Sequence, residues 1–226
     1  MEFHEQPVDE YIQSLVWLTY VQTIIYELDI NTEQEGAGAN RRSAMRLAEV
    51  GAGIEEFLEE HDLSDVRIRQ CLRDVIQYLR KERDELHDKI QYSREEIFAI
   101  LDLKSADLGL LRRIYLRVAD LECRESEMAI FRRIDKIRET FDDIRDYFED
   151  LEIANFNTVI CLQKLGGDML GGAKILNDFV EAEMERARSE IALLDAGRRQ
   201  KFELIFERLL EEKTYFMAEL AKLPSN

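Results

Sequence analysis

An acidic cluster in the second half of the chain has the residue types and spacing of a magnesium site. Asp142, Asp143 and Asp146 form the pattern DDxxD. On a helix, carboxylates at positions i, i+1 and i+4 can share one face and hold Mg²⁺ ions that bridge a diphosphate group. A Mg²⁺-dependent helical enzyme that uses this acidic face is therefore one function that the sequence offers.

The acidic cluster resembles a metal motif of prenyl-transferring and terpene-cyclising enzymes. A candidate for their second motif follows at steps of four residues, at Asn177, Glu181 and Glu185. The middle residue in those enzymes is usually Ser or Thr, and the resemblance implies a larger helical cup with a much longer separation than the 35 residues found here (177 − 142). With 48 acidic residues in the chain, such matches arise by chance. We therefore predict a solvated helix face, no cofactor, and Asp142, Asp143 and Asp146 only as weak metal candidates.

The overall charge opposes several classes of partner. Arg80 and His87 resemble the arginine–histidine pair of HEPN-type ribonucleases, but they lie in the salt-bridge-rich stretch RKERDELHDK. The net charge is −17, which repels the phosphates of nucleic acids and of anionic membranes. We predict no nucleic-acid partner, and a membrane role is disfavoured. The acidity instead favours a basic partner protein.

The distribution of proline and apolar residues predicts long helices. The only prolines are Pro7 and Pro224, and proline inside a helix costs about 3 kcal/mol. Glycine-rich or polar stretches separate the predicted helices, and the last of these is expected to continue through Gly197. The predicted ranges are 8–28, 41–61, 65–102, 106–165 and 173–222.

A heptad pattern marks the fourth predicted helix. Apolar residues follow one another at alternating steps of four and three, which is typical of a coiled-coil seam. We predict that this interaction seam packs against other helices or a second chain. Its residues are Ile130, Ile134, Ile137, Phe141, Ile144, Phe148 and Leu151.

Together these patterns predict an all-α fold. We expect an elongated antiparallel bundle of long coiled-coil-like helices with a short N-terminal helical hairpin. The hairpin comprises residues 1–63 and the bundle residues 64–226, joined as one continuous structural unit. Such a shape exposes long helical surfaces, so we expect a homo-oligomer or a complex with a protein partner.

The segment 153–180 combines two apolar helix ends with a glycine-rich tip. It resembles the head of helical pore-forming toxins, which gives a membrane-associated protein as a further alternative. Gln163, Lys164 and Asp168 interrupt its apolar run, which is too short to cross a bilayer. We therefore favour a hairpin tip that packs or docks a partner. The tip residues are Gly166, Gly167, Met169, Leu170, Gly171 and Gly172.

The cysteines and the lack of a pocket signal complete the functional expectation. Cys71, Cys123 and Cys161 are widely spaced and odd in number, which is not a disulfide framework and favours a reducing, cytoplasmic location. No phosphate-loop motif occurs, and no pattern in the sequence indicates the concave pocket that catalysis usually needs. We expect a non-catalytic structural or adaptor protein that presents helical surfaces for self-association or partner binding.

Overall fold

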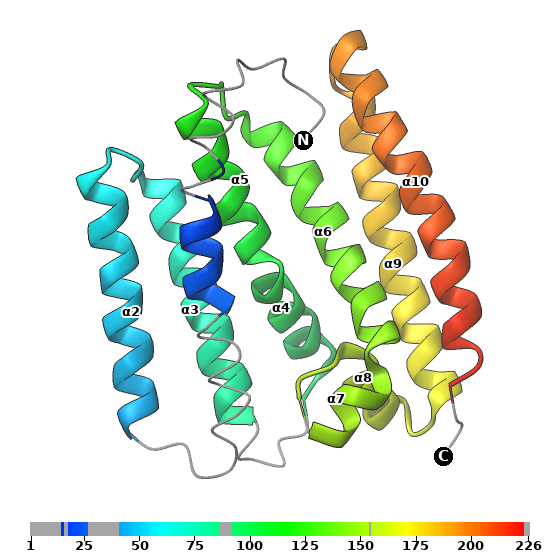
Figure 1. Ribbon diagram of the computed structural model, residues 1–226. Helices are drawn as coiled ribbons and strands as arrows, with labels where there is room; N and C mark the ends of the chain where they lie inside the picture. Colours follow the sequence, from blue (N-terminus) through cyan, green and yellow to red (C-terminus); the bar gives the residue numbers. More distant parts are fainter. Residues whose placement is uncertain (1–14, 16–17, 27–40, 86–91, 154, 224–226) are drawn as a thin grey trace. The chain divides into compact units, whose positions relative to one another are not determined.

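The structure is a computed structural model that describes residues 15, 18–26, 41–85, 92–153 and 155–223. Throughout these residues the regular secondary structure is α-helical, without strands (Figure 1). The predicted all-α class is therefore confirmed. None of the described helices is both long enough and apolar enough to cross a membrane.

The chain forms two compact units. The first contains Met1–Lys89 and Leu103–Glu125, and the second contains Ile90–Asp102 and Ser126–Asn226. The boundary predicted at residue 63 falls inside the first unit, between two helices that pack together. The division into an N-terminal hairpin and a bundle stays a prediction.

The first unit is built on α2 (Arg41–Glu60), α3 (Val66–Glu85) and α5 (Ala106–Val118). α2 ends where Asp62 takes a left-handed conformation and the Leu63 N–H donates to the Leu58 carbonyl, a common helix stop. Gly51 of α2 lies against Ile76 of α3, with only 3.3 Å between the Ile76 side chain and the position that a Cβ would take. The core is aliphatic and includes Ile54, Leu58, Ile68, Leu79, Leu110 and Ile114.

The predicted helix over 65–102 is wrong, because a new helix begins after Ser93. Helix α4 spans Arg94–Lys104. The Ser93 Oγ accepts the Glu96 N–H, and the Glu96 carboxylate accepts the Ser93 N–H at 2.8 Å. This reciprocal pair is a capping box, which satisfies backbone donors that an uninterrupted helix would not expose.

The predicted helix over 106–165 is also wrong, since the structure divides it into four. α5 ends before Asp120, which has a φ of 50°. It is followed by α6 (Glu125–Arg145), α7 (Tyr147–Ile153) and α8 (Thr158–Gly166). Asp120 in the left-handed conformation follows the end of α5, and the Asn157 side chain caps the start of α8. No proline lies at these breaks.

The last predicted helix is likewise two helices, α9 (Met169–Ala192) and α10 (Ala196–Leu220). Asp195 caps α10 by accepting the Arg198 N–H, and Gly197 lies within the first turn of α10 and not at the break. α10 runs back along α9, because Lys213 pairs with Glu181 and Arg188 lies over the Phe206 ring. The prediction of one helix through Gly197 is wrong.

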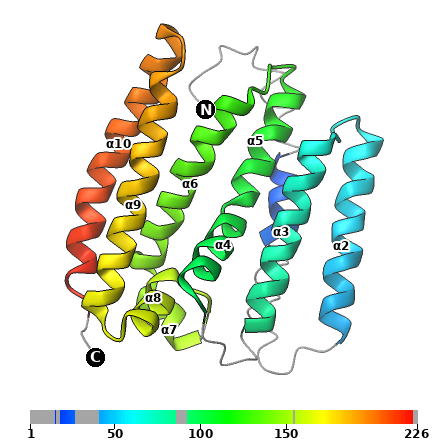
Figure 2. The same cartoon turned by 180° about the vertical axis from the view of Figure 1, so that it is seen from behind.

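The core of the second unit lies among α6, α9 and α10, which are seen from opposite sides in Figures 1 and 2. α6 and α10 run parallel, since Phe131 contacts Phe202 and, nearer the C-terminal end of both helices, Phe141 stacks on Phe216. α4 joins this unit through Phe98, whose ring stacks on Phe179 of α9 at 4.1 Å between centroids. Aromatic pairs as well as aliphatic residues therefore hold these helices together.

Candidate functional site

The predicted seam divides into a buried half and an exposed half. Ile130, Ile134, Ile137, Phe141 and Ile144 on α6 are all buried in the second unit. The helix is interrupted at Asp146, and on α7 the side chains of Tyr147 and Asp150 are buried. Phe148 and Leu151 keep the heptad spacing, yet their exposed fractions are 62% and 49%. Most of the seam is therefore internal core, and only its end is available to another molecule.

Helix α7 presents apolar and acidic side chains together. Phe148, Glu149, Leu151 and Glu152 are all exposed, and we refer to these four residues as the α7 face. Large apolar side chains that point to water, with charges beside them, are typical of protein-binding surfaces. The face combines two anchors for apolar contact with two negative charges.

A buried asparagine holds α7 in place. The side-chain amide of Asn157 donates to the Asp143 carbonyl at 2.7 Å and to the Asp150 carboxylate at 2.8 Å. Its oxygen accepts the N–H groups of Val159 and Ile160, which caps α8. One fully buried side chain thus joins the end of α6, the middle of α7 and the start of α8.

The DDxxD residues are used as structural groups. Asp143 is fully buried, and its carboxylate accepts the Thr158 N–H at 2.9 Å. Asp142 and Asp146 pair with Arg145 at 2.8 and 2.9 Å. The hydrogen bond to Asp146 is the main cause that raises the pKa of Arg145 above its ordinary value. The three carboxylates therefore do not share one open face.

The other predicted polar motifs do not form a site either. Glu181 and Glu185 pair with Lys213 and Arg188. Arg80 is exposed on α3, and His87 lies outside the described residues. Across the part of the chain that the structure describes, no group of three His, Cys, Asp or Glu residues could hold a metal ion.

The glycine-rich tip is a close contact between α8 and α9. A Cβ on Gly166 would lie 2.5 Å from the Gly172 nitrogen, and one on Gly172 would lie 2.7 Å from the Gln163 nitrogen. Gly167 ends α8 in the left-handed conformation. Asp168 then caps α9 by accepting the Gly171 N–H.

The other two tip residues have opposite environments. Met169 is buried, whereas Leu170 is exposed. The glycines thus account for packing, and the tip residue that could meet a partner is Leu170.

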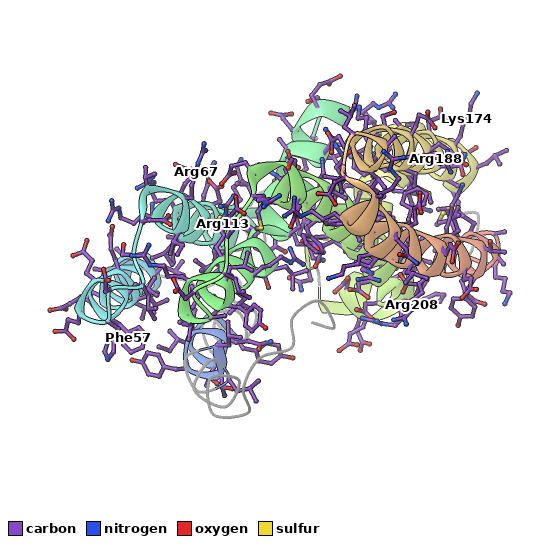
Figure 3. The ribbon with its side chains drawn as sticks, turned by 90° about the horizontal axis from the view of Figure 1, so that it is seen from above. Phe57, Arg67, Arg113, Lys174, Arg188 and Arg208 are labelled. Atoms are coloured by element: carbon purple, nitrogen blue, oxygen red, sulfur yellow. The ribbon has the colours of Figure 1, made fainter. Side chains whose placement is uncertain are left out.

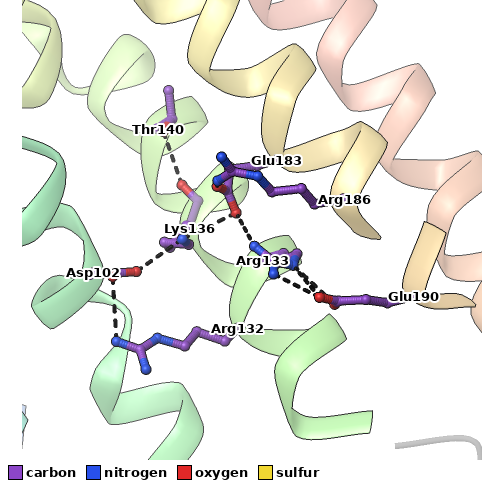
Figure 4. A network of polar contacts seen from close by, with 8 residues as sticks. All are labelled: Asp102, Arg132, Arg133, Lys136, Thr140, Glu183, Arg186 and Glu190. Atoms are coloured by element: carbon purple, nitrogen blue, oxygen red, sulfur yellow. Dashed lines mark hydrogen bonds and ion pairs between the residues drawn. The ribbon is translucent and has the colours of Figure 1, made fainter. Parts of the chain in front are cut away.

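A network of charged residues aligns α4, α6 and α9 (Figure 4). Its centre is the buried carboxylate of Glu183, which lies 3.1 Å from the Lys136 amine and 3.0 Å from the Arg133 guanidinium. Burial acts to raise the pKa of Glu183, but the charges and hydrogen bonds of Lys136 and Arg133 outweigh it and hold the pKa below its ordinary value.

The network extends to α4 and further along α9. Lys136 also meets Asp102 of α4 at 3.0 Å, and Arg133 forms a bidentate pair with Glu190 of α9. The hydrogen bond to Glu190 is the main cause that raises the pKa of Arg133. Because buried charges are tolerated only when paired, these contacts restrict how the helices can slide along one another.

Two groups of residues escaped the sequence-based search. Asn157 was expected inside a helix, although an Asn before an apolar run is a signal for a helix start. Arg133 and Lys136 lie on α6 and Glu183 lies on α9, so no local spacing relates the carboxylate to its two cations. Compared with protein-family models, curated proteins and solved structures, the chain has no match.

Proposed function

We propose that this chain is a non-catalytic adaptor protein whose α7 face binds a basic, amphipathic segment of a partner protein. The observation that carries the proposal is the exposure of Phe148 and Leu151, which continue a buried seam out of the core. A partner helix with its own apolar stripe could cover both side chains. Burying side chains of this kind is worth about 1.5–3 kcal/mol each.

The charge of the chain supports a basic partner. Glu149 and Glu152 lie beside the apolar anchors, and the whole chain has a net charge of −17. Opposite charges steer a partner toward a surface and fix its register. Two copies of this chain repel each other, so self-association through this face is the weaker alternative.

The polar clusters support a role without catalysis. Asp143 and Glu183 are buried carboxylates, and both are used in bonds that hold helices together. The odd number and wide spacing of the cysteines support the cytoplasmic location that we propose for the chain.

The experiment is a binding titration with a defined probe. A fluorescent 18-residue peptide of Leu and Lys with helical periodicity is titrated with the chain, and its anisotropy is measured. The variant Phe148→Ser with Leu151→Ser keeps every charge but removes the apolar anchors. We expect it to bind about tenfold or more weakly, because 1.4 kcal/mol corresponds to tenfold in affinity.

A matched variant and a second peptide complete the test. Leu204 on α10 is 57% exposed, so Leu204→Ser removes a similar apolar group elsewhere and should leave the affinity unchanged. Equal binding by all three proteins would mean purely electrostatic attraction and would overturn the proposal. Equal binding of a Leu–Glu peptide would also contradict it. A dimer mass in light scattering that is lost in the double variant would replace the partner with a second copy.

A further inference from the structure

Two cysteines of the first unit lie around one arginine, independently of the α7 face. The Arg113 guanidinium on α5 donates to the Cys123 sulfur at 3.3 Å. Cys71 on α3 faces Gly109, one helical turn before Arg113, and its sulfur is 3.9 Å from the position that a Cβ on Gly109 would take. Both thiols are close enough to Arg113 to act on its charge. Cys123 is thus hydrogen-bonded to Arg113, and Cys71 lies against the same helix one turn earlier.

Arg113 belongs to a group of paired charges beside Cys123, although the chain as a whole is strongly acidic. Arg113 makes two hydrogen bonds to Glu125, at 2.8 and 2.9 Å, and Arg67 of α3 approaches the same carboxylate at 3.9 Å. Arg67 and Arg113 are labelled in Figure 3. Two guanidinium groups therefore face one carboxylate. The hydrogen bond to Glu125 is the main cause that raises the pKa of Arg113 and lowers that of Glu125, so both stay charged near neutral pH.

Solvent exposure and secondary structure differ between the two cysteines. Cys123 is exposed and lies in the non-helical segment between α5 and α6, whereas Cys71 is half-buried within α3. A thiolate is the reactive form of cysteine, and a neighbouring cation stabilises it. Cys123 is therefore the thiol that a small oxidant in solution would meet first, with Cys71 behind it.

We propose that Cys123 is a peroxide-reactive thiol and that Cys71 resolves its oxidised form by forming an intramolecular disulfide. The Cys123 thiolate attacks one oxygen of a hydroperoxide, the O–O bond breaks, and the products are a sulfenic acid and, after protonation, water or an alcohol. The Cys71 thiolate then attacks the Cys123 sulfur and displaces hydroxide, which leaves as water. The peroxide is reduced and the two thiols are oxidised, so electrons balance. The new bond joins α3 to the segment that follows α5.

The test uses the intact chain and hydrogen peroxide at near-stoichiometric amounts. After quenching with an alkylating reagent, the chain is digested and its peptides are analysed by mass spectrometry. We expect a crosslinked peptide pair that contains Cys71 and Cys123 and lacks two hydrogen atoms. Cys161 on α8 is an internal control because it is half-buried and lies in the other unit. We expect Cys123 to be oxidised about tenfold faster than Cys161.

Two variants separate the roles of the two thiols and the arginine. Cys71→Ser should stop at the sulfenic acid of Cys123, which a dimedone-type probe captures, or proceed to the sulfinic acid. Arg113→Gln should slow the oxidation of Cys123 several-fold and leave that of Cys161 unchanged. Because Arg113→Gln removes an ion pair, the fold of this variant is checked by circular dichroism. The crosslink expected in the wild-type chain is tested independently of this variant. The proposal is overturned if Cys123 reacts no faster than Cys161, or if peroxide gives no Cys71–Cys123 crosslink.

Discussion

The two halves of the heptad seam have the same spacing and opposite environments. On α6, Phe141 is buried and stacks on Phe216 of α10. On α7, Phe148 continues the spacing but is mostly exposed. A period of seven residues predicts which side chains share a helix face, and it does not predict what covers that face. The helix interruption at Asp146 and the hydrogen bonds of Asn157 determine that the α7 part of the seam is exposed.

The largest expected effect compares the two phenylalanines directly. Phe141→Ala should lower the free energy of unfolding by about 4 kcal/mol, because it leaves a cavity among packed helices. Phe148→Ala should change it by less than about 0.5 kcal/mol, since its side chain lies in water. Urea denaturation of both variants measures the difference. A large loss of stability for Phe148→Ala would mean that the α7 face is covered within the folded chain.

The next prediction tests whether the close contact between α8 and α9 stabilises the fold at the end of the buried half of the seam. Gly172→Ala places a methyl group 2.7 Å from a backbone nitrogen, so the two helices must separate at a cost of about 3 kcal/mol. Gly53 of α2 has no atom within 4 Å of the corresponding position. Gly53→Ala should therefore be neutral or stabilising by up to about 1 kcal/mol. Similar thermal shifts for the two variants would contradict the close packing at the tip.

A smaller, pH-dependent effect on stability tests the charged network around Glu183, which lies beside the buried half of the seam. The pKa of Glu183 is lowered in the folded chain, so its stabilising effect is present above the ordinary glutamate pKa and is lost as the pH falls through the lowered value. Glu183→Gln should cost about 2 kcal/mol at pH 7, and this difference should shrink below about pH 4.5. The check is denaturant unfolding from pH 7 to pH 3.

The control for the pH effect is a surface glutamate. Exposed Glu207 on α10 should give no such trend when it is replaced by Gln. A Glu183→Gln variant as stable as the wild type at pH 7 would show that the network does not hold the helices together.

The sequence predicted the all-α class, because helix formation follows local apolar spacing. The spacing also identified the apolar face of α6, but it did not show that this face is buried within the chain's own core. The predicted long uninterrupted helices were wrong. The breaks are set by polar residues such as Ser93, Asn157 and Asp195, each of which caps a new helix with its side chain. The spacing of Ser93 and Glu96 is a capping-box signal that was present in the sequence. The return of α10 along α9 depends on contacts such as Lys213 with Glu181, which are formed only in three dimensions.

The most direct test of the account is hydrogen–deuterium exchange with and without the Leu–Lys peptide. Binding to the α7 face predicts slower exchange in α7, Tyr147–Ile153, that disappears when Phe148 and Leu151 are both replaced by Ser. α10 is also rich in exposed acidic side chains and provides the comparison within the same unit. Protection spread along α10, or none in α7, would contradict the proposed docking surface.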